Sequence, residues 1–294
     1  MVRGLLISWN EATVLFVKSP LIVVCSHLFA HHEVIMKKLL LAALTFCAFS
    51  SVAFASSKEI VVGATPFPHK DLLMVAKPLL EKEGFTLVVK EFSDYIQPNV
   101  ALAEKNLDAN FFQHIPYLEN MNKEKGLKLA WVAKVHIEPL GLYSKKIKKL
   151  EELKKGDLVA VPSDPTNGAR ALRLLEAHGL IKLKPGALVT VKDVVENPRG
   201  LQLKELDAAQ LPRTLMDVTA SVINTNFASE AGLIPSRDAI VIEGKDSPYA
   251  NVIVVREAEK DSAKTKALVK AMQSPEVRAF IEKDLEPKGI VPAF

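Results

Sequence analysis

Short apolar runs alternate with longer amphipathic stretches from about residue 60 onward. A short run rich in β-branched residues predicts a strand, and apolar positions spaced by three and four predict a helix with one buried face. Alternation of this kind indicates an α/β fold in which helices flank a mainly parallel sheet. We predict strands at 60–63, 86–89, 107–111 and 128–132, separated by helices over 70–83, 100–105 and 117–125.

The same alternation restarts after a basic connector at 145–149, whose lysines we interpret as a solvated face. The restart predicts a second lobe. Two helices at the end of the chain, split at Ser274-Pro275, are expected to return to the first lobe together with the last strand. Further strands are predicted at 157–162, 188–191, 201–206, 219–223, 240–242 and 251–255.

These elements predict two α/β lobes joined by more than one crossing strand. The first lobe comprises 56–143 with 246–294, and the second comprises 144–245. Two lobes connected in this way form a hinge with a cleft between them. Ligands of open α/β sheets bind beyond the carboxyl ends of the strands, so the loops that follow these strands are the place to look for a site.

The N-terminal region has a different pattern. Met36 and two lysines precede an apolar body that starts at 39–44, which is typical of a secretory signal. Small residues then alternate up to Ala55. We therefore predict a signal peptide over 36–55, cleaved after Ala55, and residues 1–35 as an upstream extension that is not native to the protein. A second apolar stretch lies upstream at 14–24. A rival interpretation makes both stretches membrane helices, but each is shorter than the ~20 residues that span a bilayer.

Composition narrows the function once this cleavage is assumed. Cys25 and Cys47 both precede Ala55, so the exported chain has no disulfide, thiol nucleophile or cysteine-bound metal. The formal net charge of the whole chain is +4, and removal of four basic and two acidic residues lowers it to +2. This near-balance gives no reason to expect a nucleic-acid partner. The remaining 239 residues suffice for two compact lobes.

Residues 161–172 lead from a strand into a helix that begins with Asp164 as a plausible cap and a proline in the first turn. A helix N-terminus offers unpaired N–H groups and positive potential to an anion. Arg170 lies within two turns of that end and is able to hold a carboxylate through two parallel hydrogen bonds. An ordinary capped helix with a solvent-facing arginine is an equally good interpretation of this segment alone.

A second group of candidates is aromatic. Phe112 and His114 alternate at a strand end, so they share one face, and Tyr117 follows in the next helix turn. Tyr95 lies upstream in a Tyr-Ile-Gln-Pro segment. Aromatic rings give an apolar group a large contact area, and a thioether sulfur gains further from ring edges. The alternative is that these residues are structural, and for at least one of Phe111 and Phe112 we favour a place in the core.

Two asparagines, Asn224 and Asn251, lie near predicted strands. An amide carbonyl accepts hydrogen bonds from an ammonium group, and an amide N–H₂ donates to a carboxylate. Asparagine is also a common turn residue, which is the better interpretation of either one taken singly.

The motifs of an enzyme are missing from the sequence. Among the histidines that remain after the predicted cleavage, no two have the i, i+4 spacing of a metal-binding helix, and neither a Gly-x-Ser-x-Gly elbow nor a phosphate-binding loop is present. These histidines are His69, His114, His136 and His178. Asp157 and Asp164 flank one strand and would lie at its opposite ends. We therefore expect a binding protein without a catalytic residue, metal or cofactor.

Eight short segments occur in order along residues 59–294. They are VGATP at 62–66, DYIQPN at 94–99, LDANFFQH at 107–114, GLYSKK at 141–146, VPSDPTN at 161–167, VENP at 195–198, AQLPR at 209–213 and SPYAN at 247–251. As a set, these segments resemble the NlpA-type methionine-binding lipoprotein family. The resemblance implies a two-lobed periplasmic binding protein that captures methionine and delivers it, as a monomer, to an inner-membrane permease driven by a cytoplasmic ATPase.

The resemblance also assigns roles to site residues. Arg170 would hold the methionine carboxylate. The thioether would lie among four ring-bearing residues, and three asparagines would surround the polar end of the ligand. The ring-bearing residues are Tyr95, Phe112, His114 and Tyr117, and the asparagines are Asn167, Asn224 and Asn251.

One feature departs from the family pattern. Members are usually lipoproteins with small residues directly before the lipid-bearing cysteine, whereas the bulky Phe46 precedes Cys47 here. The sequence therefore predicts a periplasmic protein released by cleavage after Ala55 and argues against lipid anchoring at Cys47.

Other functions stay open at this point. A methionine-containing dipeptide or another apolar amino acid is the main alternative ligand. A periplasmic hydrolase acting on such ligands and a surface adhesin are alternatives from other classes of protein.

Overall fold

The computed structural model describes residues 58–244 and 247–294. The predicted extension at 1–35, the signal peptide at 36–55 and Cys47 lie outside the described residues, so these predictions are not tested. No helix in the described part of the chain combines the length and apolar character needed to cross a membrane.

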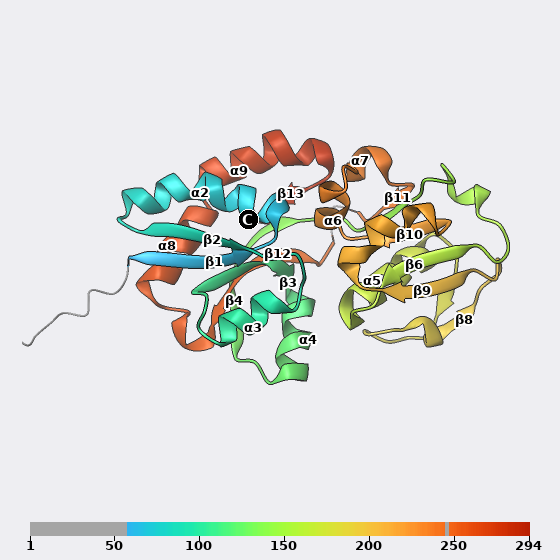
Figure 1. Cartoon of the computed structure of the whole chain (residues 1–294), viewed down its shortest axis with the longest axis horizontal. Coiled ribbons are helices and arrows are strands. Elements are labelled where there is room, and N and C mark those ends of the chain that lie inside the picture. The colour runs from blue at the N-terminus through green and yellow to red at the C-terminus, as the bar shows by residue number, and fades with distance from the viewer. Residues whose placement is uncertain (1–57, 245–246) are drawn as a thin grey trace, which may run out of the picture. The chain divides into compact units, whose positions relative to one another are not determined.

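The first sheet has six strands in the order β13-β4-β12-β3-β1-β2 (Figure 1). Its strands are β1 (Glu59–Ala64), β2 (Thr86–Glu91), β3 (Ala109–His114), β4 (Leu129–Ile137), β12 (Ala250–Arg256) and β13 (Val291–Pro292). The helices of this lobe are α2 (Asp71–Lys82), α3 (Gln97–Ala103), α4 (Ile115–Lys125), α8 (Ala263–Met272) and α9 (Pro275–Phe280), with short turns at Pro66–Lys70, Glu257–Glu259, Ile281–Leu285 and Glu286–Lys288.

The second sheet has five strands in the order β11-β5-β10-β6-β9. They are β5 (Gly141–Tyr143), β6 (Leu158–Pro162), β9 (Gln202–Leu206), β10 (Ala220–Ile223) and β11 (Val241–Ile242). The helices of this lobe are α5 (Pro165–Ala177), α6 (Thr225–Glu230) and α7 (Pro235–Asp238), with 3₁₀ turns at Leu150–Glu152, Val191–Asp193 and Ala208–Met216. A separate ribbon pairs β7 (Lys182–Leu183) with β8 (Val194–Glu196).

The two-lobed α/β fold is confirmed, and each sheet is mixed, with most of its strands running in one direction. In the first sheet β12 runs antiparallel to both of its neighbours, β3 and β4. In the second sheet β5 runs antiparallel to β10 and β11. The short last strand, β13, is also antiparallel to its neighbour β4. Strands β5 and β12 are the first to be formed after the chain crosses between the sheets. Because each enters its sheet from the cleft side, it runs opposite to the strands whose carboxyl ends face the cleft.

Two details of the sequence prediction also need correction. Gly141–Tyr143 pairs with strands of the second sheet, so the chain leaves the first lobe before residue 141 and not after 143. Residues 188–190 form no strand. They lead into the Val191–Asp193 turn. There the Thr190 side chain accepts a hydrogen bond from the backbone of the turn, and the Asp193 side chain accepts one from the backbone N–H of Thr190. The polar capping at this turn outweighs the β propensity of the flanking valines.

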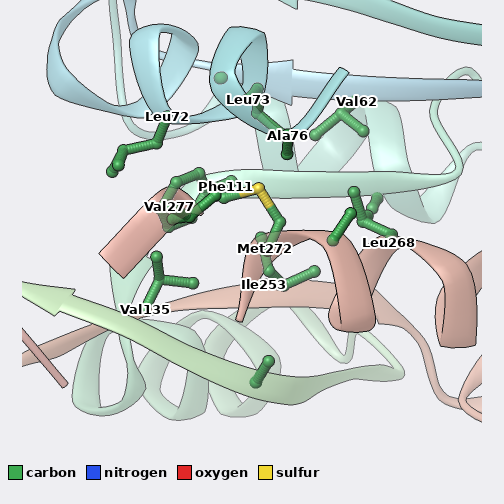
Figure 2. Close-up of a cluster of buried hydrophobic side chains, with 14 of the residues drawn as sticks. Val62, Leu72, Leu73, Ala76, Phe111, Val135, Ile253, Leu268, Met272 and Val277 are labelled. Atoms are coloured by element: carbon green, nitrogen blue, oxygen red, sulfur yellow. The ribbon is translucent and has the colours of Figure 1, made fainter. Parts of the chain in front are cut away.

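The core of the first lobe lies between its sheet and helices α2 and α8, which contact each other. Figure 2 shows Phe111 of β3 and Ile253 of β12 beside Met272 of α8. Phe111 is fully buried, which confirms that one of the two adjacent phenylalanines is a core residue. The break between α8 and α9 is also as predicted, since Ser274 caps α9 by accepting a hydrogen bond from the N–H of Val277.

We expect Phe111→Ala to lower the free energy of unfolding by about 3–5 kcal/mol, because it removes a buried ring and leaves a cavity. The matched control is Trp131→Ala, at an aromatic residue of β4 whose exposed fraction is 43%. Chemical denaturation measures both variants. Equal losses for the two would contradict the placement of the core.

Candidate functional site

A cavity between the two lobes encloses about 350 Å³ of empty space, part of it open to solvent. Its lining comes from the cleft ends of strands, the loops that follow them and the first turns of the next helices, in both lobes. All eight residues predicted for the site lie in this lining. Their part in binding a ligand stays a prediction. The lining residues are Tyr95, Phe112, Gln113, His114, Tyr117, Glu138, Asn167, Arg170, Asn224, Thr225, Asn226 and Asn251.

Helix α5 presents two of these residues because of how it begins. Asp164 is the cap, and its carboxylate accepts hydrogen bonds from the backbone N–H of Asn167 at 2.9 Å and from the Asn167 amide at 3.0 and 3.1 Å. Gly168 lets the first turn approach strand β6 closely, because a Cβ there would lie only 2.8 Å from the carbonyl oxygen of Pro162. These contacts fix Asn167 and Arg170 on the cavity side of the helix.

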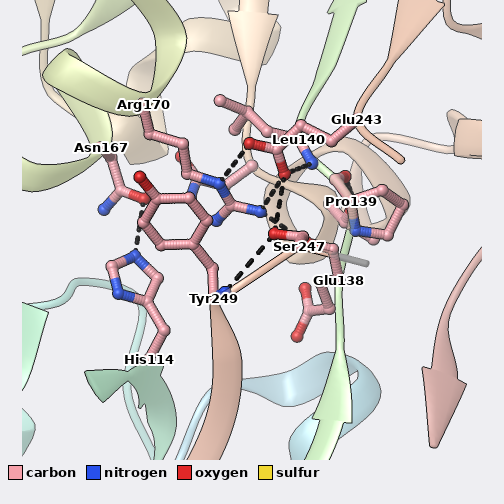
Figure 3. Close-up of polar contacts among 11 residues, drawn as sticks. His114, Glu138, Pro139, Leu140, Asn167, Arg170, Glu243, Ser247 and Tyr249 are labelled. Carbon is pink, nitrogen blue, oxygen red and sulfur yellow. Dashed lines mark hydrogen bonds and ion pairs between the residues drawn. The ribbon is translucent and has the colours of Figure 1, made fainter. Parts of the chain in front are cut away.

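Arg170 is buried, with 4% of its surface exposed, and makes a charged pair within the chain. Its Nε donates to Oε1 of Glu243 at 2.8 Å, and its Nη2 donates to Oε2 at 2.5 Å. Nη2 also donates to the backbone carbonyl of Glu138 at 2.7 Å. The ring of Tyr249 lies 4.3 Å from the guanidinium carbon (Figure 3). The arginine therefore forms its two parallel bonds with Glu243, and Nη1 has no hydrogen bond to a described residue.

A polar bridge joins the lobes beside this pair. His114 caps α4, because its Nδ1 accepts a hydrogen bond from the N–H of Tyr117 at 3.1 Å. Its proton therefore lies on Nε2, which donates to Oδ1 of Asn167 at 3.1 Å. The Asn224 amide donates to the same oxygen at 2.9 Å. Burial, followed by the nearby charge of Arg170, lowers the pKa of His114 to about 3, so the imidazole is a neutral donor.

An aromatic wall forms the other side of the cavity. The ring of Tyr95 lies 5.9 Å from those of Phe112 and Tyr117, and 4.9 Å from that of Phe227 in the second lobe. The hydroxyl of Tyr95 donates across the cleft to Oδ1 of Asn226 at 2.5 Å. Rings from both lobes therefore meet around the apolar part of the cavity.

Several residues of the site are not predicted from the sequence. Gln113, Thr225, Asn226 and Glu138 line the cavity, and Glu243 pairs with Arg170. Gln113 and Asn226 lie next to predicted site residues, so the strand-end rule that found their neighbours could have found them. Glu243 directly follows the predicted strand at 240–242, so the same rule applied to it. Glu138 lies beyond the predicted strand at 128–132, and only the longer β4, which ends at Ile137, brings it to a strand end.

A cluster behind the cavity has the donor atoms of a metal site. His69, His136 and Glu138 are buried, and their donor atoms lie within 4.8 Å of one another. An imidazole that binds a metal through Nε2 carries its proton on Nδ1, which then needs an acceptor. Nδ1 of His136 is buried and has no hydrogen-bond partner among the described residues. The cluster fits hydrogen bonds donated to Glu138 better than it fits a metal ion.

Two α/β lobes with a buried polar and aromatic cavity between them define the class of two-lobed substrate-binding proteins. The sequence profile of the NlpA lipoprotein family matches residues 60–294. The chain therefore belongs to the NlpA lipoprotein family.

Individual relatives agree with this assignment. The D-methionine-binding lipoprotein MetQ of Salmonella typhi is 50% identical over 74% of this chain and 81% of its own length. The outer membrane lipoprotein 3 of Mannheimia haemolytica is 47% identical over 82% of this chain and 92% of its own. A nutrient-binding protein of Burkholderia cenocepacia, solved bound to methionine, is 49% identical with a TM-score of 0.77, covering 80% of this chain and all of that one.

The neutral state of His114 predicts a specific pH dependence. Its pKa in the folded protein lies far below the ordinary value of about 6.5, so only the unfolded chain takes up this proton as the pH falls. Between about pH 7 and pH 5 the wild type should lose about 2 kcal/mol of unfolding free energy that His114→Gln does not lose. Denaturation at both pH values measures the unfolding free energy of each protein. Subtracting the loss in His114→Gln from the loss in the wild type removes the contribution of the other titratable groups, which both proteins share. Identical pH dependence in the two proteins would contradict a buried neutral His114.

Proposed function

We propose that this chain is the extracytoplasmic substrate-binding protein of an ABC importer for methionine. The observation that carries the proposal is one cavity in which an aromatic wall, a buried arginine and amide groups face one another. Methionine has an apolar thioether at one end and a charged α-amino-acid group at the other, so it matches both the aromatic wall and the polar groups of the cavity. Membership of the NlpA family and the methionine-bound relative from Burkholderia cenocepacia support the same ligand.

In the proposed complex the thioether packs against Tyr95, Phe112 and Tyr117, with the edge of His114 nearby. Sulfur gains from contact with ring edges, and the rings exclude water from the side chain. The carboxylate is directed toward Arg170, where Nη1 is the donor that Glu243 leaves available. Asn167, Asn224 and Asn251 surround the polar end, which completes the roles expected for the predicted site residues.

Transport requires no covalent step in this scheme. A ligand that contacts both lobes favours the closed state through its differential affinity for that state. The closed monomer then docks on an inner-membrane permease that a cytoplasmic ATPase drives. The expected location is the periplasm, in a form released by cleavage after Ala55 and without a lipid at Cys47.

Competition binding tests the choice of ligand. We expect methionine to displace bound methionine at far lower concentration than leucine or glycyl-methionine, because leucine lacks the sulfur and the dipeptide adds length at the polar end. Preference for glycyl-methionine would favour the dipeptide alternative. Equal competition by leucine would favour a general receptor for apolar amino acids.

Arg170→Ala should weaken methionine binding by about 3–5 kcal/mol, because a buried carboxylate would lose its charged partner. Isothermal calorimetry measures the affinity. Arg173→Ala is the matched control, since Arg173 lies one turn further along α5 with its side chain 38% exposed and pairs with Glu176. An affinity of Arg170→Ala within about twofold of wild type, in a variant with a normal unfolding transition, would contradict the role given to Arg170.

A further inference from the structure

A β-bulge interrupts strand β3 where the strand reaches the cavity. Phe111 and Gln113 pair with consecutive residues of β12, so Phe112 is an extra residue on β3. Side chains three apart in a regular strand point to opposite faces of the sheet. Here Gln113 and Asn110 lie on the same side, because the Gln113 amide donates to Oδ1 of Asn110 at 2.9 Å. The bulge therefore re-aims side chains beside the site, as bulges near binding sites commonly do.

Three buried amides hold this bulge against helix α3. Asn99 of α3 joins Asn110 and Gln113 of β3, and we call these three side chains the amide network. The Asn99 amide donates to Oε1 of Gln113 at 2.8 Å. Its Oδ1 accepts from Gln113 at 2.6 Å and from Asn110 at 2.8 Å. Nδ2 of Asn110 also donates to the backbone carbonyl of Pro98 at 3.1 Å. These bonds fasten the first turn of α3 to β3.

The polar groups of the amide network are used within the chain. Gln113 lines the cavity, whereas Asn99 and Asn110 lie outside its described lining. Nε2 of Gln113 donates to both asparagines, so both of its N–H groups already have an acceptor. Its Oε1 accepts from Asn99. The bonds of Gln113 therefore indicate that it holds its neighbours in place and does not bind a ligand through its amide.

The segment that the amide network fastens carries Tyr95. This residue lies two positions before α3, in a turn where Oδ1 of Asp94 accepts hydrogen bonds from two backbone N–H groups at 2.7 and 2.8 Å. The hydroxyl of Tyr117 donates to the Tyr95 carbonyl at 2.9 Å. The ring of Tyr95 lies 5.9 Å from that of Phe112, which is the extra residue of the bulge. The network therefore connects the two segments that carry these facing rings.

We propose that the amide network positions Tyr95 relative to Phe112 and thereby sets the size of the slot for the apolar side chain of the ligand. Breaking any bond of a buried network leaves a polar group unpaired away from water, so the network strongly favours one arrangement. That arrangement fixes the distance between β3 and the turn before α3. The slot is therefore kept from widening by residues of which two lie outside the cavity.

The inference rests on the proposed function, and its test measures the ratio of two affinities. The ligands are methionine and ethionine, whose side chain is longer by one methylene. The wild type should prefer methionine by about 10- to 200-fold, as expected of a slot of fixed size. Asn99→Ala should lower this ratio at least about threefold, because a slot that widens admits the longer side chain. Isothermal calorimetry measures both affinities. A purely structural role would weaken both ligands equally and leave the ratio unchanged.

A double-mutant cycle identifies the residue through which the amide network acts. In a Tyr95→Ala protein the positioned ring is absent, so Asn99→Ala should change the ratio by less than about 1.5-fold there. Asn110→Ala is the second variant, for use if Asn99→Ala fails to fold. It removes the bond to Pro98 and leaves Asn99 paired with Gln113, and it should also lower the ratio.

Asn122→Ala is the matched control. Asn122 lies in α4 of the same lobe, outside the described lining of the cavity, and its amide donates to the carbonyl of Leu129 at 2.7 Å. It should leave the ratio within about 1.5-fold of wild type. An unchanged ratio in the folded network variants, or a change that persists in the Tyr95→Ala protein, would overturn the positioning role while the proposed function stands. A wild-type protein that does not bind methionine would overturn both.

Discussion

The buried charge of Arg170 is the constraint on which the cleft depends. A cation that is almost fully buried is stable only when it is paired and its donors are satisfied. Glu243 supplies the opposite charge from the segment after β11, and Glu138 supplies a backbone carbonyl from the segment after β4. The N–H of Leu140 also donates to Glu243, at 3.0 Å. One guanidinium therefore holds α5 against both segments through which the chain crosses between the sheets.

The buried histidines allow this charge pattern to persist. Burial keeps His69, His114 and His136 neutral, so they supply directed N–H groups without adding a positive charge. A protonated imidazole at any of these positions would neutralise a carboxylate or repel Arg170. With the histidines neutral, Arg170 and Glu138 are the charged side chains in the described lining of the cavity.

The fold and the cavity lining could largely be predicted, because both follow from local pattern. Strand and helix periodicity placed the two lobes, and the strand-end rule placed Arg170 and His114 at the cleft. The sequence did not indicate which strands run antiparallel, since periodicity carries no information about the direction in which a crossing strand enters its sheet. Glu138 and Glu243 were not predicted as site residues for a related reason. Glu243 follows a two-residue strand and meets Arg170 across 73 residues of sequence, so its partner is a property of the tertiary fold.

The contacts between the lobes support the proposal that a small ligand controls closure. Near the cavity the direct bonds include His114 to Asn167 and Tyr95 to Asn226, which exchange with water when the lobes separate. Such exchange makes each bond worth only about 1 kcal/mol net. The aromatic wall and the charged groups need a partner in both lobes to be fully covered. In the proposed mechanism, a ligand that fills the cavity provides this partner in the closed state alone, and the difference in contacts supplies the free energy that shifts the equilibrium.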